Sequence, residues 1–431
     1  MYSQDAVTRS RLPLFALLAA AAMAITLGAC PREPGDPPPC ARAPTVTVAT
    51  SGQKVCQLTG DEDRALAEPT LNRTFTRYGL SNTDLGASFE YDGKLWFLFG
   101  DSFPTGGGAP NPLCGDAIAF TAATSFAGCP LLSFVAAPSG TFQSPVVPGI
   151  DLGCYDVPLH GVSTGTALYA WFSTGCMSRS ILARSDDAQS FSAVGTLSDC
   201  NCDTTCSAGP GASCLDRSCH FVNVSAAIVP EGAAVGLPGD GDRLLLFGSG
   251  VYRQSNVYLA VTSLSQIEDF AAIRYFGGAD ATSCAPQWSS VEAEAAPLFD
   301  TTNDNGNTEP CVGELSVHFD TALGRWVALY NCNHTLDAIR VADSPWGPWS
   351  AAAPLFESSS AYCDYIFRPD AGCPQLADHP GDEEAAGDTY GPYAIGSYSQ
   401  VTDAGAQLFF TMSPRNPYNV MLMTATVSAL P

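Results

Sequence analysis

The apolar residues of this chain come in short runs without helical spacing. From about residue 70 onward, apolar runs alternate with segments rich in Gly, Pro, Asp and Ser, and no useful stretch has the 3.6-residue period of an amphipathic helix. Short runs bounded by turn residues are typical of β-strands. The pattern therefore predicts an all-β protein.

Five of these runs share one pattern, in which a turn glycine is followed directly by an apolar strand. The glycines are separated by 72, 76, 83 and 81 residues, and they are Gly93, Gly165, Gly241, Gly324 and Gly405. The strands are apolar at consecutive positions, as expected where neighbouring sheets cover both faces. Five matched units predict a five-bladed β-propeller with four-stranded blades. A β-sandwich is the competing architecture, but it does not need five matched units.

The first unit carries an aspartate near each end of its predicted hairpin. If Asp92 and Gly93 form a two-residue turn, the numbers of paired residues sum to 185, and Asp84 lies opposite Asp101. Like charges that face each other across strands are unfavourable unless another role uses them. A bulge in the hairpin would shift this register, but both side chains would still lie at the same end.

The other four units test whether these aspartates only build a blade. The residues eight positions after the turn glycines are Asp101, Ser173, Ser249, Cys332 and Ser413, so only the first unit carries a charge there. We therefore favour a chemical role for the pair over strand capping. Two carboxyl groups suit glycoside hydrolysis, in which one protonates the leaving oxygen and the other activates water or attacks the sugar. Retention and inversion of configuration both stay open.

A third candidate acid is Glu314, on the strand before the fourth turn glycine. It lies near the position that Asp84 occupies in the first unit. We expect it to project into the same central funnel, the alternative being a solvent-facing side chain.

Further candidates are side chains that stack on sugar rings or bind hydroxyl groups, with packing or strand-end bonding as the alternative for each. They are His160, Tyr252, Arg253, Tyr390, Tyr393, Asn416, Tyr418 and Asn419. A single histidine is too little to predict a metal site, and the sequence predicts no cofactor.

The segment Ser185–Phe191 (SDDAQSF) resembles the Asp-box turn between the outer strands of sialidase-like propellers. Gln189 replaces the usual glycine of that turn. The role of the turn is structural, and we expect Asp187 to bond within it.

Six motifs in order resemble the domain-of-unknown-function family numbered 4185. They are Thr83–Gly86, Leu98–Asp101, Tyr252–Ala260, Gly313–Ser316, Ser344–Ser350 and Asn416–Met423. This family overlaps the endo-D-arabinanases of glycoside hydrolase family 183, and the likeness runs from about residue 75 to the C-terminus. It implies a five-bladed propeller with carboxylates at a central funnel that hydrolyse furanoside linkages in cell-wall-type polysaccharides. Carried over by motif, Asp84 and Asp101 would be the acid and base pair, and Glu314 a further acid.

The N-terminus has the pattern of an export signal. Arg9 and Arg11 precede an apolar run from Leu12 to Leu27 that is short for a membrane span. The sequence LGAC, which ends at Cys30, resembles the bacterial lipobox, in which the cysteine is acylated. An ordinary signal peptide cut nearby is the alternative.

These features predict three parts and a location. We expect a lipoprotein signal peptide over residues 1–29, a Pro-rich tether and N-terminal segment over residues 30–70, and the propeller domain over residues 71–431. A lipid on Cys30 would anchor the protein in the bacterial cell envelope, at the outer membrane, on the periplasmic face or at the cell surface.

Cysteine usage agrees with export. The chain has 17 cysteines, so 16 remain to pair if Cys30 carries lipid. Five of them lie in an insertion at about residues 200–219, namely Cys200, Cys202, Cys206, Cys214 and Cys219, and His220 follows. A zinc knuckle is one interpretation of this group, and we favour a disulfide-stapled insertion.

Charge and composition narrow the functional classes. The net charge is −24, with 19 basic and 43 acidic residues, so nucleic acid is an improbable partner. Our first hypothesis is a monomeric, surface-anchored glycoside hydrolase of the furanosidase type that acts on polysaccharide. The second is a non-catalytic, lectin-like propeller that binds a polysaccharide or a protein, and the third is a structural envelope lipoprotein. Only the enzyme needs several acids that converge on one funnel.

Overall fold

The computed structural model describes residues 43–430, except for 105–113, 151, 154, 203–205, 207–208, 213, 234, 281 and 372–386. The predicted signal peptide, Cys30 and most of the predicted tether lie outside the described residues. All described residues belong to the unit Pro38–Pro431. None of the described helices is both long and apolar enough to span a membrane.

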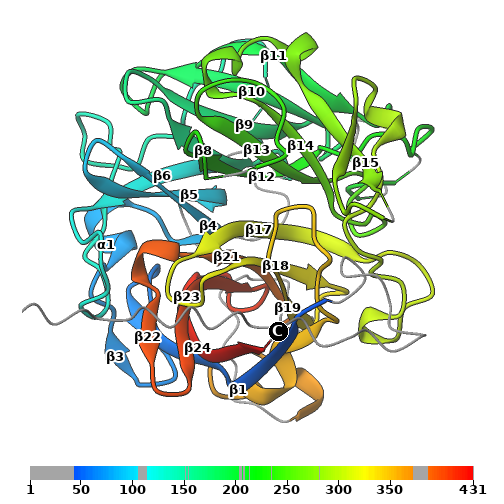
Figure 1. The fold of residues 1–431 in the computed structure, drawn as a ribbon. Coiled ribbons are helices and arrows are strands. Elements are labelled where there is room, and N and C mark those ends of the chain that lie inside the picture. The colour runs from blue at the N-terminus through cyan, green and yellow to red at the C-terminus, as the bar shows by residue number, and fades with distance from the viewer. Residues whose placement is uncertain are drawn as a thin grey trace, which may run out of the picture. The chain divides into compact units, whose positions relative to one another are not determined.

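Five antiparallel sheets hold almost all of the strands (Figure 1). The first blade consists of β4 (Asn82–Tyr91), β5 (Lys94–Phe103), β6 (Gly115–Thr121) and β7 (Ser133–Phe134). The second consists of β8 (Pro158–Ser163), β9 (Leu168–Thr174), β10 (Arg179–Ser185) and β11 (Ser192–Asp199). The third consists of β12 (Asn223–Val229), β13 (Arg243–Ser249), β14 (Tyr258–Ser263), β15 (Arg274–Ala279) and β16 (Pro286–Ser289).

The fourth blade consists of β17 (Val312–Asp320), β18 (Arg325–Cys332), β19 (Leu336–Ala342) and β20 (Ala353–Glu357). The fifth consists of β21 (Thr389–Ala394), β23 (Gly405–Pro414), β24 (Met421–Leu430) and β1 (Thr45–Gln57), with β22 (Gln400–Thr402) paired to β23. A separate small hairpin joins β2 (Glu62–Asp63) and β3 (Glu68–Pro69). The helical elements are short: α1 (Thr74–Tyr78), η2 (Leu264–Gln266), η3 (Phe270–Ala272), η4 (Glu292–Glu294), η5 (Asp304–Gly306), η6 (Ser358–Ala361), η7 (Pro369–Ala371) and η8 (Gly396–Tyr398).

The first strands of the five blades form a closed ring. β4 packs against β8, β8 against β12, β12 against β17, β17 against β21, and β21 against β4. A closed ring of five sheets is a five-bladed β-propeller, so the predicted fold is confirmed. Each predicted turn glycine lies at the start of the second strand of a blade, or just before it. In the first blade Asp92 and Gly93 have φ of 51° and 67°, as the predicted two-residue hairpin turn requires.

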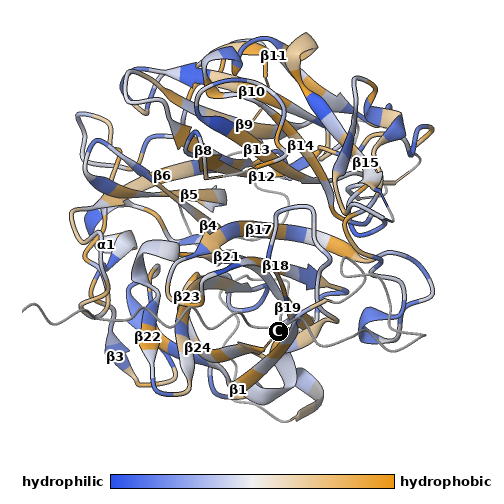
Figure 2. Cartoon of the chain, viewed as in Figure 1, coloured by the Kyte–Doolittle hydropathy of each residue, from blue (hydrophilic) through white to orange (hydrophobic). Residues whose placement is uncertain are grey.

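Apolar side chains fill the spaces between neighbouring blades. On β5, Phe97 and Phe99 pack in a cluster with Phe409 of the fifth blade, whereas Leu98 packs in another cluster with Trp171 of the second. Alternate residues of one strand thus face different blades, which explains why the strands are apolar at consecutive positions. Figure 2 shows apolar residues concentrated along the strands.

The N-terminal strand completes the last blade. β1 pairs with β24 from Thr45 opposite Leu430 to Gln57 opposite Met421. The propeller therefore begins within the segment that the sequence assigned to the N-terminal part before residue 71. As an outermost strand β1 has one solvent-facing side, and it lacks the turn glycine that identifies the second strands.

Disulfides staple the insertion after β11, as the sequence predicted. Cys200 pairs with Cys219, Cys202 with Cys214, and Cys206 with Cys176. These bonds use the five cysteines of the insertion, so its zinc-knuckle alternative is excluded.

The Asp-box-like turn also has its predicted role. Asp187 accepts hydrogen bonds from the backbone N–H groups of Gln189 at 2.9 Å and Ser190 at 2.7 Å, in the connection between β10 and β11.

The disulfide Cys56–Cys129 ties the closing strand β1 to the first blade and joins residues 73 apart in sequence. We expect the Cys56→Ser/Cys129→Ser variant to lose about 2–4 kcal/mol of unfolding free energy, because the cross-link restricts the unfolded chain. Denaturant unfolding followed by tryptophan fluorescence measures this. The control Cys202→Ser/Cys214→Ser opens a 12-residue separation and should lose less. Equal stability of the first variant and the wild type would contradict this role.

Candidate active site

The hairpin of β4 and β5 brings Asp84 and Asp101 together at the end away from its turn. The predicted register holds from the turn as far as Ala87, where a bulge at Gly86 shifts it by one residue. Asp84 therefore lies opposite Gly100, and the predicted direct pairing with Asp101 was wrong. The bulge uses the left-handed φ of Gly86, which is +98°.

One tyrosine hydroxyl links the two carboxyl groups. Tyr418 donates a hydrogen bond to Oδ2 of Asp84, and the same hydroxyl lies 3.4 Å from Oδ2 of Asp101. Tyr390 donates a second hydrogen bond to Oδ2 of Asp84 at 2.9 Å. Oδ1 of Asp101 accepts the backbone N–H of Tyr155 at 3.0 Å. The predicted candidates Tyr390 and Tyr418 thus contact the predicted acids.

Burial raises the pKa of both carboxyl groups. The pKa of Asp84 lies well above its usual value, because burial and the charge of Asp101 outweigh the hydrogen bonds from Tyr418 and Tyr390. Burial raises the pKa of Asp101 to about 6. Their exposed fractions are only 5% and 9%. Burial therefore favours retention of a proton by this pair to a higher pH than isolated carboxyl groups allow.

Glu314 has a different environment, built by the loop between β13 and β14. The hydroxyl of Tyr252 donates to Oε1 of Glu314 at 2.5 Å, and Nη2 of Arg253 lies 3.9 Å from Oε2. Gly313 leaves room for this arginine, because a Cβ there would lie 3.2 Å from Nε of Arg253. A hydrogen-bond donor and a cation thus lie beside this carboxyl group.

The three acids belong to one site. In the ring, β21 lies between β4 and β17 and carries Tyr390 and Tyr393. The charges of Glu314 and Asp84 add to burial in raising the pKa of Tyr393, and the charge of Glu314 also raises the pKa of Asp84. Asp84 and Glu314 are each the third residue of a first strand. The site therefore lies at the end of the channel where the first strands begin.

The sequence model of the family described as Domain of unknown function (DUF4185) matches residues 70–424. The chain belongs to this family. A comparison with curated proteins gave no match.

Solved structures resemble the DUF4185 chain in fold at low sequence identity. A candidate hydrolase from Bacteroides ovatus aligns with a TM-score of 0.46 and 10% identity, over 82% of this chain and 87% of that chain. A glycosyl hydrolase from Bacteroides ovatus aligns with a TM-score of 0.43 and 11% identity, over 89% of this chain and 97% of that chain. A GH43_1 enzyme from Xanthomonas citri aligns with a TM-score of 0.39 and 11% identity, over 80% of this chain and 87% of that chain.

Two predicted residues of the DUF4185 chain have contacts within the fold. Oδ1 of Asn419 accepts a hydrogen bond from Oγ1 of Thr59 at 3.2 Å, which holds the segment after β1. The backbone carbonyl of Asn416 accepts the N–H of Phe367 at 2.9 Å. The contact of Asn419 is therefore a hydrogen bond at a strand end, which was the alternative to sugar binding for this residue.

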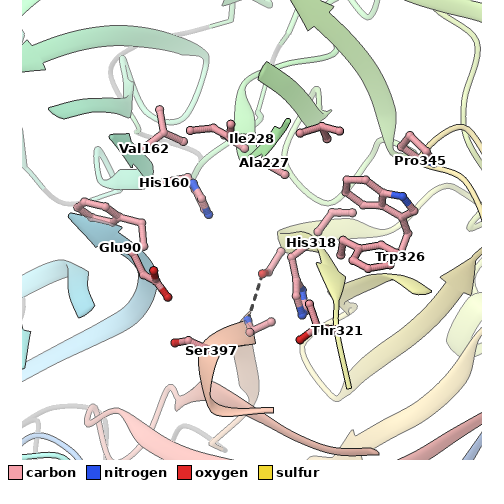
Figure 3. Close-up of a pocket in the computed structure, with 18 of the residues that line it drawn as sticks. Glu90, His160, Val162, Ala227, Ile228, His318, Thr321, Trp326, Pro345 and Ser397 are labelled. Atoms are coloured by element: carbon pink, nitrogen blue, oxygen red, sulfur yellow. Dashed lines mark hydrogen bonds between the residues drawn. The ribbon is translucent and has the colours of Figure 1, made fainter. Parts of the chain in front are cut away.

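His160 lies apart from the acids. It lines a cavity at the other end of the channel, where Figure 3 shows it near Glu90 and Ser397. Burial lowers its pKa to about 4, and the charge that adds to this effect comes from His318. The structure thus does not bring His160 to the carboxylates with which the sequence grouped it.

Two buried acids near the site were not predicted. Asp116 on β6 is fully buried, and its pKa is raised well above the usual value by burial and then by the charges of Asp101 and Asp84. Asp337 on β19 accepts a hydrogen bond from Oγ1 of Thr389 at 2.6 Å, and burial raises its pKa to about 7. Both lie on third strands, which the glycine pattern does not mark. An isolated acid in an apolar run was the signal available in the sequence.

His334 was also not predicted. Its ring contacts the guanidinium of Arg253, and its Nδ1 lies 3.7 Å from Oδ2 of Asp388. It therefore belongs to the surroundings of Glu314. Among the described residues, no group of three or more His, Cys, Asp or Glu is placed to hold a metal ion.

The raised pKa of Asp101 predicts a pH dependence of stability. A carboxyl whose pKa is higher in the folded state stabilises the fold below its unfolded pKa, and this contribution is lost as pH rises through the folded pKa. We expect the unfolding free energy to fall between about pH 4 and pH 6. The Asp101→Asn variant should remove on the order of 2–3 kcal/mol of that fall, at about 1.4 kcal/mol per pKa unit.

Urea unfolding from pH 4 to pH 7.5 measures the effect. The control is Asp280→Asn, because backbone and side-chain hydrogen bonds from Ser283 lower the pKa of exposed Asp280, so its contribution has the opposite sign. A profile for Asp101→Asn that parallels the wild type would contradict the assignment.

Proposed function

We propose that this protein is a glycoside hydrolase that cleaves furanoside, arabinan-like linkages in cell-wall-type polysaccharide by carboxylate acid and base chemistry. The observation that carries the proposal is the gathering of Asp84, Asp101 and Glu314 at one end of the propeller channel, where Asp84 is buried beside Asp101 and Glu314 lies beside Tyr252 and Arg253. The furanoside substrate is inferred from the family resemblance of the motifs around these residues.

The environments suggest a division of roles. Asp84 is the proposed general acid, because burial and the neighbouring Asp101 keep a proton on it for the leaving oxygen. Glu314, beside Tyr252 and Arg253, is the proposed group that activates water or attacks the sugar. Asp101 then acts through Asp84 as a positioning and charge-tuning residue. This division differs from the acid and base pair of Asp84 and Asp101 that the sequence resemblance implies.

We also propose that the enzyme is a monomer anchored to the cell envelope through a lipid on Cys30. The support is the N-terminal sequence pattern, together with disulfides in the propeller that are typical of exported proteins.

Replacing either acid should stop turnover. We expect Asp84→Asn and Glu314→Gln each to lower kcat by about 10²–10⁴-fold, since each removes a proton-transfer group. Sugar release from arabinans, arabinogalactan and other envelope polysaccharides measures the rate, and circular dichroism checks folding. The matched control is Asp320→Asn, on the same strand as Glu314 and equally removed from solvent, which should retain activity. Undiminished turnover in both acid variants would refute the mechanism.

The link between Tyr418 and Asp84 predicts a shift in the pH profile. The hydrogen bond from Tyr418 stabilises the ionised carboxylate and so lowers the pKa of Asp84. Tyr418→Phe should therefore raise that pKa and move the alkaline limb of kcat/KM to higher pH, by about one unit for each 1.4 kcal/mol of lost stabilisation.

The control for this shift is Tyr398→Phe, because the hydroxyl of Tyr398 donates to the backbone carbonyl of Ala123, in the connection between β6 and β7 of the first blade. Its alkaline limb should match that of the wild type. An unchanged or acid-shifted limb in Tyr418→Phe would remove Asp84 from the role of general acid.

A further inference from the structure

A cavity of about 950 Å³ lies at the end of the channel opposite the three acids (Figure 3). All five blades contribute to its wall through the last residues of their first strands, namely Glu90, Ser163, Val229, Phe319 and Ala394. Asp84 and Glu314 lie near the beginning of these strands, and Asp101 lies beside Asp84 near the end of β5, so the two sites occupy opposite ends of the same ring.

The wall and rim of this cavity carry apolar and aromatic side chains that solvent reaches. Trp346 lines it and is half-buried, whereas Trp326 contributes to the wall but is only 6% exposed. The lining side chains of Val235, Phe319 and Ile228 are 88%, 47% and 37% exposed. Exposed apolar side chains around a concave surface are characteristic of ligand-binding sites rather than of ordinary surface.

Polar atoms without partners occur at the same place. Nδ1 of His160, Nδ1 of His318 and Oγ of Ser397 are buried and have no hydrogen-bond partner among the described residues, and all three residues line the cavity. Figure 3 shows these three side chains around the same open space. Buried polar atoms are usually paired in folded proteins. A bound molecule with hydroxyl groups, directly or through water, would supply partners.

The charge of the wall limits the ligand. No lysine or arginine occurs among the lining residues that the structure describes. Glu90 is an exposed acid at the wall, and Asp343 is ion-paired with Arg325. Because burial lowers the pKa of His160 to about 4, its ring is neutral at pH 7. An anionic ligand would thus meet the charge of Glu90, with no lysine or arginine among the described lining residues to bind it.

We infer that this cavity is a second carbohydrate-binding site, which takes a segment of a neutral sugar chain. The indole ring of Trp346 and the ring of Phe319 provide surfaces for the C–H face of a sugar ring, and the serine and imidazole groups provide partners for its hydroxyls. The volume lies within the range of pockets that enclose ligands of oligosaccharide size. This site does not depend on the proposed hydrolase activity, because it would hold a polysaccharide equally well in a protein that does not cleave it.

The test separates binding at this cavity from binding or turnover at the acids. Neutral α-1,5-arabinohexaose and cellohexaose are titrated by calorimetry into the Asp84→Asn/Glu314→Gln protein, in which no cleavage is expected. We expect binding of at least one of the two probes, and Trp346→Ala in the same background should raise the Kd of this event at least 10-fold. Trp346→Phe keeps an aromatic face and should restore most of the affinity. Phe319→Ala, at an exposed position, is a second variant that should weaken the same event without disturbing the core.

Three results would overturn the inference. The first is absence of binding by both neutral probes. The second is a Kd that is the same in Trp346→Ala, Phe319→Ala and the parent protein, which would place the sugar elsewhere. The third is binding of decanoate or of hexagalacturonate in place of the neutral sugars, which would assign an aliphatic or anionic ligand to the cavity. None of these results bears on whether the wild type hydrolyses glycans, so the two proposals fail separately.

Discussion

Coverage of both faces of every sheet is the constraint on which this structure depends. A strand such as β5 directs alternate apolar residues toward two different blades, so neither side tolerates solvent. In a closed ring of five such sheets, each sheet covers the apolar faces of its two neighbours. The pairing of β1 with β24 builds the last blade from the two ends of the described chain. The disulfide Cys56–Cys129 adds a covalent link between that closing strand and the first blade.

Ring closure also decides where chemistry is possible. The first strands are surrounded by their neighbours along their length, so their polar side chains meet one another mainly at the two ends of the channel. At one end, burial of Asp84 and Asp101 is unfavourable for two charges and keeps a proton in the pair. Elsewhere in the ring, Tyr252 and Arg253 contact the carboxyl group of Glu314. Carboxyl groups in different environments within one site are the arrangement that acid and base catalysis requires.

The sequence predicted those parts of the fold that repeat. The turn glycines marked the second strand of every blade, because a tight turn and a strand covered on both faces leave a recognisable pattern. Strand β1 left no such pattern, since one of its sides faces solvent. Asp101 was found because it is the only charged residue at its position among the five units. Asp84 was found because the predicted hairpin places it opposite Asp101, and Glu314 because it lies near the corresponding position of the fourth unit. Asp116 and Asp337 were not found, since their burial depends on blade packing that no local pattern encodes. The bulge at Gly86 likewise changed a pairing that turn geometry alone had fixed.

The two ends of the channel show how one scaffold separates two kinds of chemistry. The same first strands begin among tyrosines and acids and end among indoles, imidazoles and serines, as the paths of β4 from Asp84 to Glu90 and of β17 from Glu314 to Phe319 illustrate. Side chains on a strand rise by only about 3.3 Å per residue, so five or six positions are enough to separate the two environments. The strands that fix the positions of the acids therefore also fix the wall of the cavity. A sequence change at one end can alter its chemistry while the ring packing that supports the other end is kept.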